Sequence, residues 1–266
     1  MVAPTDGVSF YFFDFDDNIM FLSTPIFLLN TVTKGERAVS TGEFANIQQL
    51  LGRPGPWEEY AVFDGSYRNF RDIPPDQLST GQTQHFVADV TKAVTSSEDR
   101  WQGPSWKYFI YACQKQRPVS IVTARGHTRE TLKAGVRVLF EKRFIPREPL
   151  YHTLFPVGNK EVQRELGDTK LEMTIPALKR RAIIRTVEEA LKLHGSEPNL
   201  RFGMSDDDPQ NVNLIIRAMC ECKKSYPDRR FFVINTHMQE EVKLEVFPVE
   251  FPVIDQPETA AADILK

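Results

Sequence analysis

The first apolar run of the chain ends abruptly in a cluster of acidic residues. Residues 8–13 have the sequence Val-Ser-Phe-Tyr-Phe-Phe, and Asp14-Phe-Asp-Asp-Asn18 follows at once. A short and nearly continuous apolar run is typical of a strand that is buried on both faces, as in a parallel sheet. Ligands of open α/β sheets bind beyond the carboxyl ends of the strands, so we expect this acidic cluster to lie at a binding edge.

Strand and helix patterns alternate in the second half of the chain. They predict helices over residues 106–113, 128–140, 174–194 and 212–223, and strands over residues 119–122, 202–204 and 230–235. Repeated strand–helix–strand units imply right-handed crossovers and a parallel sheet. We therefore expect an α/β protein with helices flanking a parallel sheet.

Residues 21–105 interrupt this alternation. Their first part predicts a hairpin, in which residues 27–33 and 38–40 flank a turn at 34–36. Residues 51–105 are rich in glycine and proline and have no clear strand–helix alternation. We interpret them as an inserted subdomain or a set of packed loops.

Composition limits the class of protein. The 266 residues are 41% hydrophobic and 26% charged, which is ordinary for a globular chain with its own core. A net charge of -3 gives no strong sign of general nucleic-acid binding. Three cysteines do not suggest a disulfide scaffold and fit a reducing compartment. No apolar stretch reaches the ~18 residues of a membrane span, and no signal peptide is evident, so we expect a soluble, cytoplasmic protein of unknown oligomeric state.

Polar residues follow three of the predicted strands. They are Asp14 and Asp16, then Thr123, then Asp206 and Asp207. The carboxyl ends of parallel strands share one edge of the sheet, and carboxylates gathered there repel unless a cation or a shared proton offsets their charge. A site made of oxygen ligands suits Mg²⁺ better than zinc. The sequence therefore predicts a magnesium site.

Phosphoryl transfer is the chemistry that this set of residues suits. A metal ion offsets the charge of carboxylate and phosphate, so that an anionic nucleophile can approach an anionic substrate. Asp14 and Asp16 lie two apart at a strand end and can face the same way, so one can attack phosphorus while the other protonates the leaving oxygen. Thr123 and Lys179, which lies in the first turns of its predicted helix, would hold the phosphate oxygens.

Four motifs follow one another along the chain. They are Phe12-Phe-Asp-Phe-Asp-Asp-Asn-Ile19, Val119-Ser-Ile-Val-Thr123, Lys179 early in a helix, and Phe202-Gly-Met-Ser-Asp-Asp-Asp208. Each motif is weak alone, but in this order the chain resembles the haloacid dehalogenase-like (HAD) superfamily of phosphatases. The resemblance implies a Rossmann-like parallel sheet flanked by helices, with a cap-like segment inserted after the first strand.

The resemblance also implies how the chain divides. The core comprises residues 1–20 and 106–255, a cap or inserted loop segment comprises residues 21–105, and residues 256–266 form a loose tail. In this superfamily the cap and loops select the substrate, and residues 21–105 contain no motif that identifies one. Sugar phosphates, nucleotides, phosphoproteins and polynucleotide ends all stay open as substrates.

The two first-motif aspartates receive the catalytic roles in this resemblance. Asp14 would be the nucleophile and a Mg²⁺ ligand, and Asp16 the general acid/base, with its backbone carbonyl on the metal. Thr123, Ala124 and Lys179 would hold phosphate. The remaining metal ligands would be Asp206 and Asp207. The expected activity is Mg²⁺-dependent hydrolysis of a phosphomonoester through an aspartyl-phosphate.

Several assignments stay open. Asp17-Asn18 stands where the superfamily most often has Gly-Thr, and the metal-ligand register within residues 206–208 is ambiguous. Lys160 competes with Lys179 for the phosphate role; we favour Lys179 because of its helix and its distance ahead of the last acids.

Three further residues have open roles. Arg125 and His127 either line the entrance to the site or have a structural or solvent-facing role. Asn211 either bonds a metal ligand or caps the following helix.

Other functions were weighed against a phosphatase. A dehalogenase of the same fold would give Asp16 no task, since it has no alkoxide to protonate. A two-metal nuclease would usually add histidine or glutamate ligands and a basic groove. The alternatives that we retain are a non-catalytic phosphate-binding or scaffold protein on the same fold and a phosphatase of polynucleotide ends.

Overall fold

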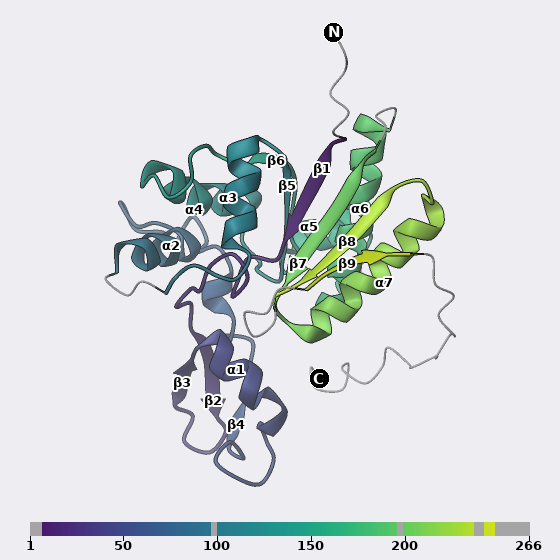
Figure 1. Cartoon of the computed structure of the whole chain (residues 1–266). Coiled ribbons are helices and arrows are strands. Elements are labelled where there is room, and N and C mark those ends of the chain that lie inside the picture. Colours follow the sequence, from purple (N-terminus) through teal and green to yellow (C-terminus); the bar gives the residue numbers. More distant parts are fainter. Residues whose placement is uncertain (1–6, 97–99, 196–198, 237–241, 248–266) are drawn as a thin grey trace.

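The computed structural model describes residues 7–96, 100–195, 199–236 and 242–247 (Figure 1). The strands are β1 (Ser9–Phe13), β2 (Ile26–Asn30), β3 (Glu36–Val39), β4 (Tyr60–Ala61), β5 (Pro118–Thr123), β6 (Leu150–Pro156), β7 (Arg201–Asp206), β8 (Arg230–Asn235) and β9 (Val242–Val246). The helices are α1 (Thr41–Ile47), α2 (His85–Thr95), α3 (Trp106–Lys115), α4 (Arg129–Glu141), α5 (Lys160–Glu165), α6 (Ile175–His194) and α7 (Pro209–Ser225). Two 3-10 turns span Gln48–Leu50 and Arg68–Phe70.

The main sheet confirms the expected α/β class. Its strand order is β6-β5-β1-β7-β8-β9, and every pair from β6 to β8 is parallel. The last strand, β9, pairs with β8 in the antiparallel sense, so the sheet is mostly rather than wholly parallel. This arrangement is consistent with a Rossmann-like fold. Neither β6 nor β9 was predicted from the sequence.

Alternate residues of β1 face two separate layers of helices. Phe10 and Phe12 pack into the apolar cluster formed with α6 and α7. Tyr11 and Phe13 face the cluster that contains side chains of α2, α3 and α4. Figure 1 shows these two sets of helices on opposite sides of the sheet. Burial on both faces explains why the sequence of this strand is an almost unbroken apolar run.

The predicted helices are present, and three unpredicted ones, α1, α2 and α5, join them. Thr174 caps α6, because its hydroxyl accepts a hydrogen bond from the backbone of Ala177. The unpredicted α2 lies within residues 21–105 but packs on α4 of the core, where a Cβ at Gly135 would lie 2.4 Å from the ring of Phe86. The other unpredicted helices are α1, in the inserted segment, and α5. None of the helices in the described ranges is long and apolar enough to cross a lipid bilayer.

A second, smaller sheet lies outside the main one, with strand order β3-β2-β4 (Figure 1). The antiparallel pairing of β2 with β3 confirms the predicted hairpin. This sheet has its own apolar cluster, which includes Ile26, Leu28, Val39 and Ile47. The expected tail at residues 256–266 lies outside the described residues.

Candidate active site

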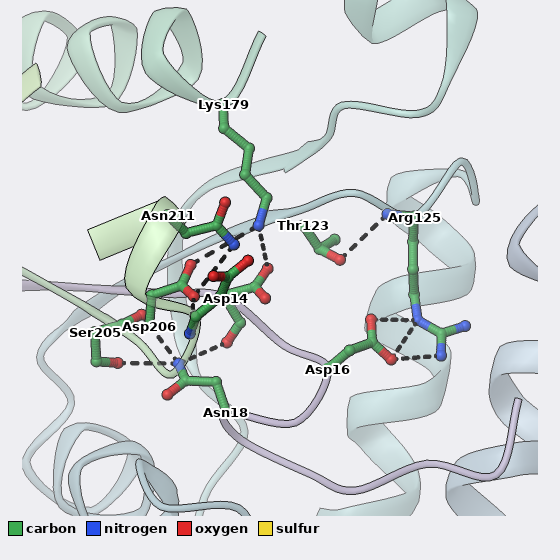
Figure 2. Close-up of polar contacts among 10 residues, drawn as sticks. Asp14, Asp16, Asn18, Thr123, Arg125, Lys179, Ser205, Asp206 and Asn211 are labelled. Carbon is green, nitrogen blue, oxygen red and sulfur yellow. Dashed lines mark hydrogen bonds and ion pairs between the residues drawn. The ribbon is translucent and has the colours of Figure 1, made fainter. Parts of the chain in front are cut away.

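Three neighbouring strands bring the predicted residues to one edge of the main sheet (Figure 2). Asp14 follows β1, Thr123 ends β5 and Asp206 ends β7. The register aligns these ends, since Phe13 lies opposite both Ile121 and Ser205. The backbone amide of Asp14 also donates to the carbonyl of Ser205. The expected gathering of acids and a hydroxyl at the carboxyl edge is therefore present.

Lys179 enters this cluster from the second turn of α6. Its side chain is 5% exposed, and its Nζ lies 3.2 Å from Oδ1 of Asp14 and 3.8 Å from Oδ2 of Asp206. Burial alone would lower the pKa of Lys179, but the two carboxylates outweigh burial and hold that pKa above its usual range. Lys160 is instead exposed at the start of α5. The lysine at the cluster is Lys179.

Asp14, Asp206 and Asp207 each place one carboxylate oxygen within 4.8 Å of the others. Burial raises the pKa of all three carboxyls above the usual range, that of Asp207 to about 7. Lys179 lowers the pKa of Asp14 and Asp206, yet less than burial raises it. Oδ2 of Asp206 is buried and has no hydrogen-bond donor among the described residues. Three carboxylates around one ammonium thus retain an excess of negative charge, which fits a hard divalent cation.

The other oxygen of Asp206 is held by the turn into α7. Oδ1 accepts hydrogen bonds from the backbone amide of Asp208 at 3.0 Å and from Nδ2 of Asn211 at 3.3 Å. Asn211 therefore bonds the expected metal ligand, which was one of its two open roles. Asp208 is exposed and lies outside the group of three acids.

Asn18 is a component that the sequence did not reveal. It is fully buried, and its Nδ2 donates to the backbone carbonyls of Asp14 and Ser205 and to the hydroxyl of Ser205. Its Oδ1 accepts from the hydroxyls of Ser105 at 2.6 Å and Thr236 at 3.1 Å. This one amide ties the ends of β1 and β7 together, and so fixes the spacing between Asp14 and the acids after β7.

The backbone conformation of Asp17 shows how Asp17-Asn18 can stand where the HAD superfamily most often has Gly-Thr. Its φ is 58°, in the left-handed region that glycine adopts freely and aspartate tolerates. Its amide donates to the carbonyl of Met20 at 2.9 Å. The chain thus makes a tight turn here without glycine.

Asp16 does not face Asp14 as the sequence suggested. Figure 2 shows its carboxylate turned toward Arg125. Nε of Arg125 donates to Asp16 at 2.8 Å and Nη2 donates at 2.6 Å, in a two-pronged ion pair. The strand β1 ends at Phe13, so the rule that side chains two apart on a strand share a face does not extend to Asp14 and Asp16.

The loop after β5 differs in part from expectation. Thr123 is buried at the strand end, and its hydroxyl accepts from the amide of Arg125 at 3.3 Å. Ala124 is exposed at the same edge. Arg125 and His127 do not line an entrance or face solvent: both are buried, at 1% and 0% exposure. Burial lowers the pKa of His127 to about 3.

The geometry brings together a lysine, a hydroxyl and three carboxylates at one edge, with a fourth carboxylate turned aside. Asp14, Thr123, Lys179, Asp206 and Asp207 belong to that cluster, and Ala124 borders it. Comparison of the chain with protein-family models, with curated proteins and with solved structures found no match.

Proposed function

We propose that this chain is a Mg²⁺-dependent phosphomonoester hydrolase of the HAD-like kind, which acts through an aspartyl-phosphate on Asp14. The observation that carries the proposal is the contact of buried Lys179 with Asp14 inside a group of acids with too few cations to balance them. Such a site favours binding of a cation, and the ammonium offers a partner for an anionic substrate.

The metal would be held by side chains that already lie close together. Asp14, Asp206 and Asp207 would supply carboxylate oxygens, and Asp16 its backbone carbonyl. Oδ2 of Asp206, which accepts no hydrogen bond from the described residues, and the purely oxygen donor set fit Mg²⁺. When bound, the ion would offset the negative charge that carboxylate and phosphate bring together.

Asp14 would act as the nucleophile. Lys179 holds its Oδ1 and so fixes the orientation of the carboxylate. A bond would form between a carboxylate oxygen of Asp14 and phosphorus as the bond from phosphorus to the leaving oxygen breaks. Asp16 would give that oxygen a proton.

The second half returns the enzyme to its starting state. A water molecule would attack phosphorus and give a proton to Asp16, and the bond between Asp14 and phosphorus would break to release inorganic phosphate. Lys179, the hydroxyl of Thr123 and the backbone of Ala124 would hold the phosphoryl oxygens through both steps.

We assign the inserted segment the role of a cap that limits access to the site. Phe70 and Asp72 contact the loop after β5, since the amide of Gly126 donates to the carbonyl of Phe70 and the amide of Thr128 to Asp72. That position favours selection of the substrate by the insertion.

The test uses acetyl phosphate and p-nitrophenyl phosphate, with Mg²⁺ or with EDTA. We expect Mg²⁺-dependent release of phosphate, and a phosphoryl group on the peptide that contains Asp14 after rapid acid quenching. Asp14→Asn removes both, whereas Asp76→Asn, at an exposed loop position, leaves both unchanged. Hydrolysis that survives Asp14→Asn rules out the nucleophile. A wild-type chain that binds Mg²⁺ but neither hydrolyses nor becomes phosphorylated supports the scaffold alternative.

A further inference from the structure

Arg125 and Asp16 form an ion pair at the site, fully buried on the side of Arg125, to which the proposed chemistry assigns no role. Both carboxylate oxygens of Asp16 accept hydrogen bonds from the guanidinium, whose side chain has no solvent exposure. Paired, two-pronged contacts fix the orientation of a carboxylate as well as its position. The side chain of Asp16 is therefore held in one direction.

The guanidinium is itself held in a socket built by other segments. The rings of Phe70 and Phe86 lie 4.8 and 4.9 Å from its central carbon. Nη2 donates to the hydroxyl of Thr24 at 2.8 Å, and that hydroxyl donates to Asp89 of α2. Phe70 belongs to the inserted segment, so the orientation of Asp16 depends on where the insertion lies.

Stability is a poor explanation for this arrangement. Nη1 of Arg125 is buried without a hydrogen-bond partner among the described residues. A buried charge with an unsatisfied donor costs free energy that the pair does not fully recover. What the socket supplies is a fixed direction for Asp16.

That direction suits an acid–base group in an in-line displacement. The attacking and leaving oxygens lie on opposite sides of phosphorus, so a group that protonates the leaving oxygen must stand off from Asp14 by the width of the phosphoryl group. Asp16 leaves the strand end close to Asp14, but its carboxylate points away from Asp14 and toward Arg125 (Figure 2). Arg125 holds it there.

We propose that Arg125 is the positioning residue that sets Asp16 opposite Asp14 for proton transfer, and that the inserted segment controls this alignment through Phe70. The inference rests on the proposed phosphatase function and assigns a second task to the insertion, beyond access. Arg125 touches neither substrate nor phosphorus in this scheme; it acts through Asp16 alone.

The test compares two aryl phosphates that differ in how much they need an acid. The leaving group of dinitrophenyl phosphate departs without a proton, whereas the leaving group of phenyl phosphate needs one. The quantity measured is kcat/KM, because it reports the step that forms the aspartyl-phosphate. The variants are Arg125→Lys, Asp16→Asn, the double variant, and Arg129→Lys as a control at a partly exposed ion pair with Glu165.

We expect Arg125→Lys to lower kcat/KM for phenyl phosphate by about a hundredfold, within the range that general acid catalysis contributes. For dinitrophenyl phosphate the loss stays within about threefold, because an aligned acid contributes little there. The double variant loses no more kcat/KM than Asp16→Asn alone, since Arg125 and Asp16 act together and either change removes the same function. Arg129→Lys leaves kcat/KM unchanged for both substrates.

A second variant covers the case in which Arg125→Lys fails to fold. Phe70→Leu keeps the guanidinium and removes one ring of its socket, so it should show the same preference for dinitrophenyl phosphate, with a loss of about tenfold for phenyl phosphate. Equal losses of kcat/KM for the two esters, or additive losses in the double variant, overturn the positioning role of Arg125. The proposed phosphatase function would still stand. A wild-type chain inactive on both esters and on acetyl phosphate overturns the phosphatase function, and this inference with it.

Discussion

The Nζ of Lys179 lies 3.2 Å from Oδ1 of Asp14, and both side chains are nearly excluded from solvent. The same ammonium lies 3.8 Å from Asp206. One lysine therefore offsets the charge of carboxylates that burial makes costly to ionise. Its removal tests how strongly this group of acids depends on a positive charge.

Lys179→Met preserves much of the side-chain length and removes the charge. Without metal, we expect the free energy of unfolding to fall by roughly 3 kcal/mol, as when one partner of a buried ion pair is removed. Saturating Mg²⁺ should recover part of that loss, since the ion replaces the missing charge. Urea unfolding in EDTA and in Mg²⁺ measures both quantities.

The control for this change is Lys192→Met, at an exposed position of the same helix. It should alter stability by less than about 0.5 kcal/mol. If Lys179→Met is as stable as the wild type in EDTA, the ammonium does not balance the acids.

Which residues gather at the site could be predicted, because strand ends carry that information locally. An apolar run that stops at an acid marks the carboxyl end of a strand, and parallel pairing then aligns Asp14, Thr123 and Asp206. Lys179 was found for a similar reason, as a cation in the early turns of a strongly periodic helix.

Side-chain directions at the site could not be predicted in the same way. The bond between Arg125 and Asp16 joins residues 109 positions apart, and those of Asn18 to Ser205 span 187 positions. No local pattern specifies such partners. The strand also ends at Phe13, so the alternation on which the expected direction of Asp16 depended does not reach that residue.

The helix α2 was missed although its signal was present. Its buried residues Phe86, Val90 and Val94 recur every four positions, as on one face of a helix. It begins after Gln84 with no side-chain cap, and its neighbourhood is rich in turn-forming residues. Those turn-forming residues favoured an interpretation as packed loops over a helix of only a few turns.

Mg²⁺ binding should strengthen as the pH rises from 6 to 8. Burial, with smaller effects from Asp206 and Asp17, raises the pKa of Asp207 to about 7. The metal binds the carboxylate form, so the proton competes below that pKa and not above it. The dissociation constant for Mg²⁺ should fall by about tenfold across this range, because the ionised fraction of a group with pKa 7 rises about that much.

Calorimetric titration with Mg²⁺ at pH 6, 7 and 8 checks this dependence. Asp207→Asn should weaken Mg²⁺ binding and reduce its dependence on pH. Asp228→Asn, at an exposed position, should leave both the affinity and its pH dependence unchanged. Affinity that is independent of pH in the wild type contradicts a role for Asp207 as a ligand.

His127 should make the protein less stable in mild acid. Its ring is fully buried, neither ring nitrogen has a hydrogen-bond partner among the described residues, and burial lowers its pKa to about 3. The unfolded chain binds a proton here near pH 6.5. Between pH 6.5 and 3 the unfolded state therefore holds more protons than the folded state, and stability falls as the pH falls.

His127→Leu removes this proton uptake and keeps an apolar group beside Phe86. Relative to the variant, the wild type should lose about 2 kcal/mol between pH 7 and pH 5, which is the cost of about 1.5 units below the unfolded pKa. Urea unfolding of both proteins at pH 5, 6 and 7 measures the difference. A stability difference that stays constant over this range would mean that the folded protein accepts a proton on His127 as readily as the unfolded chain does.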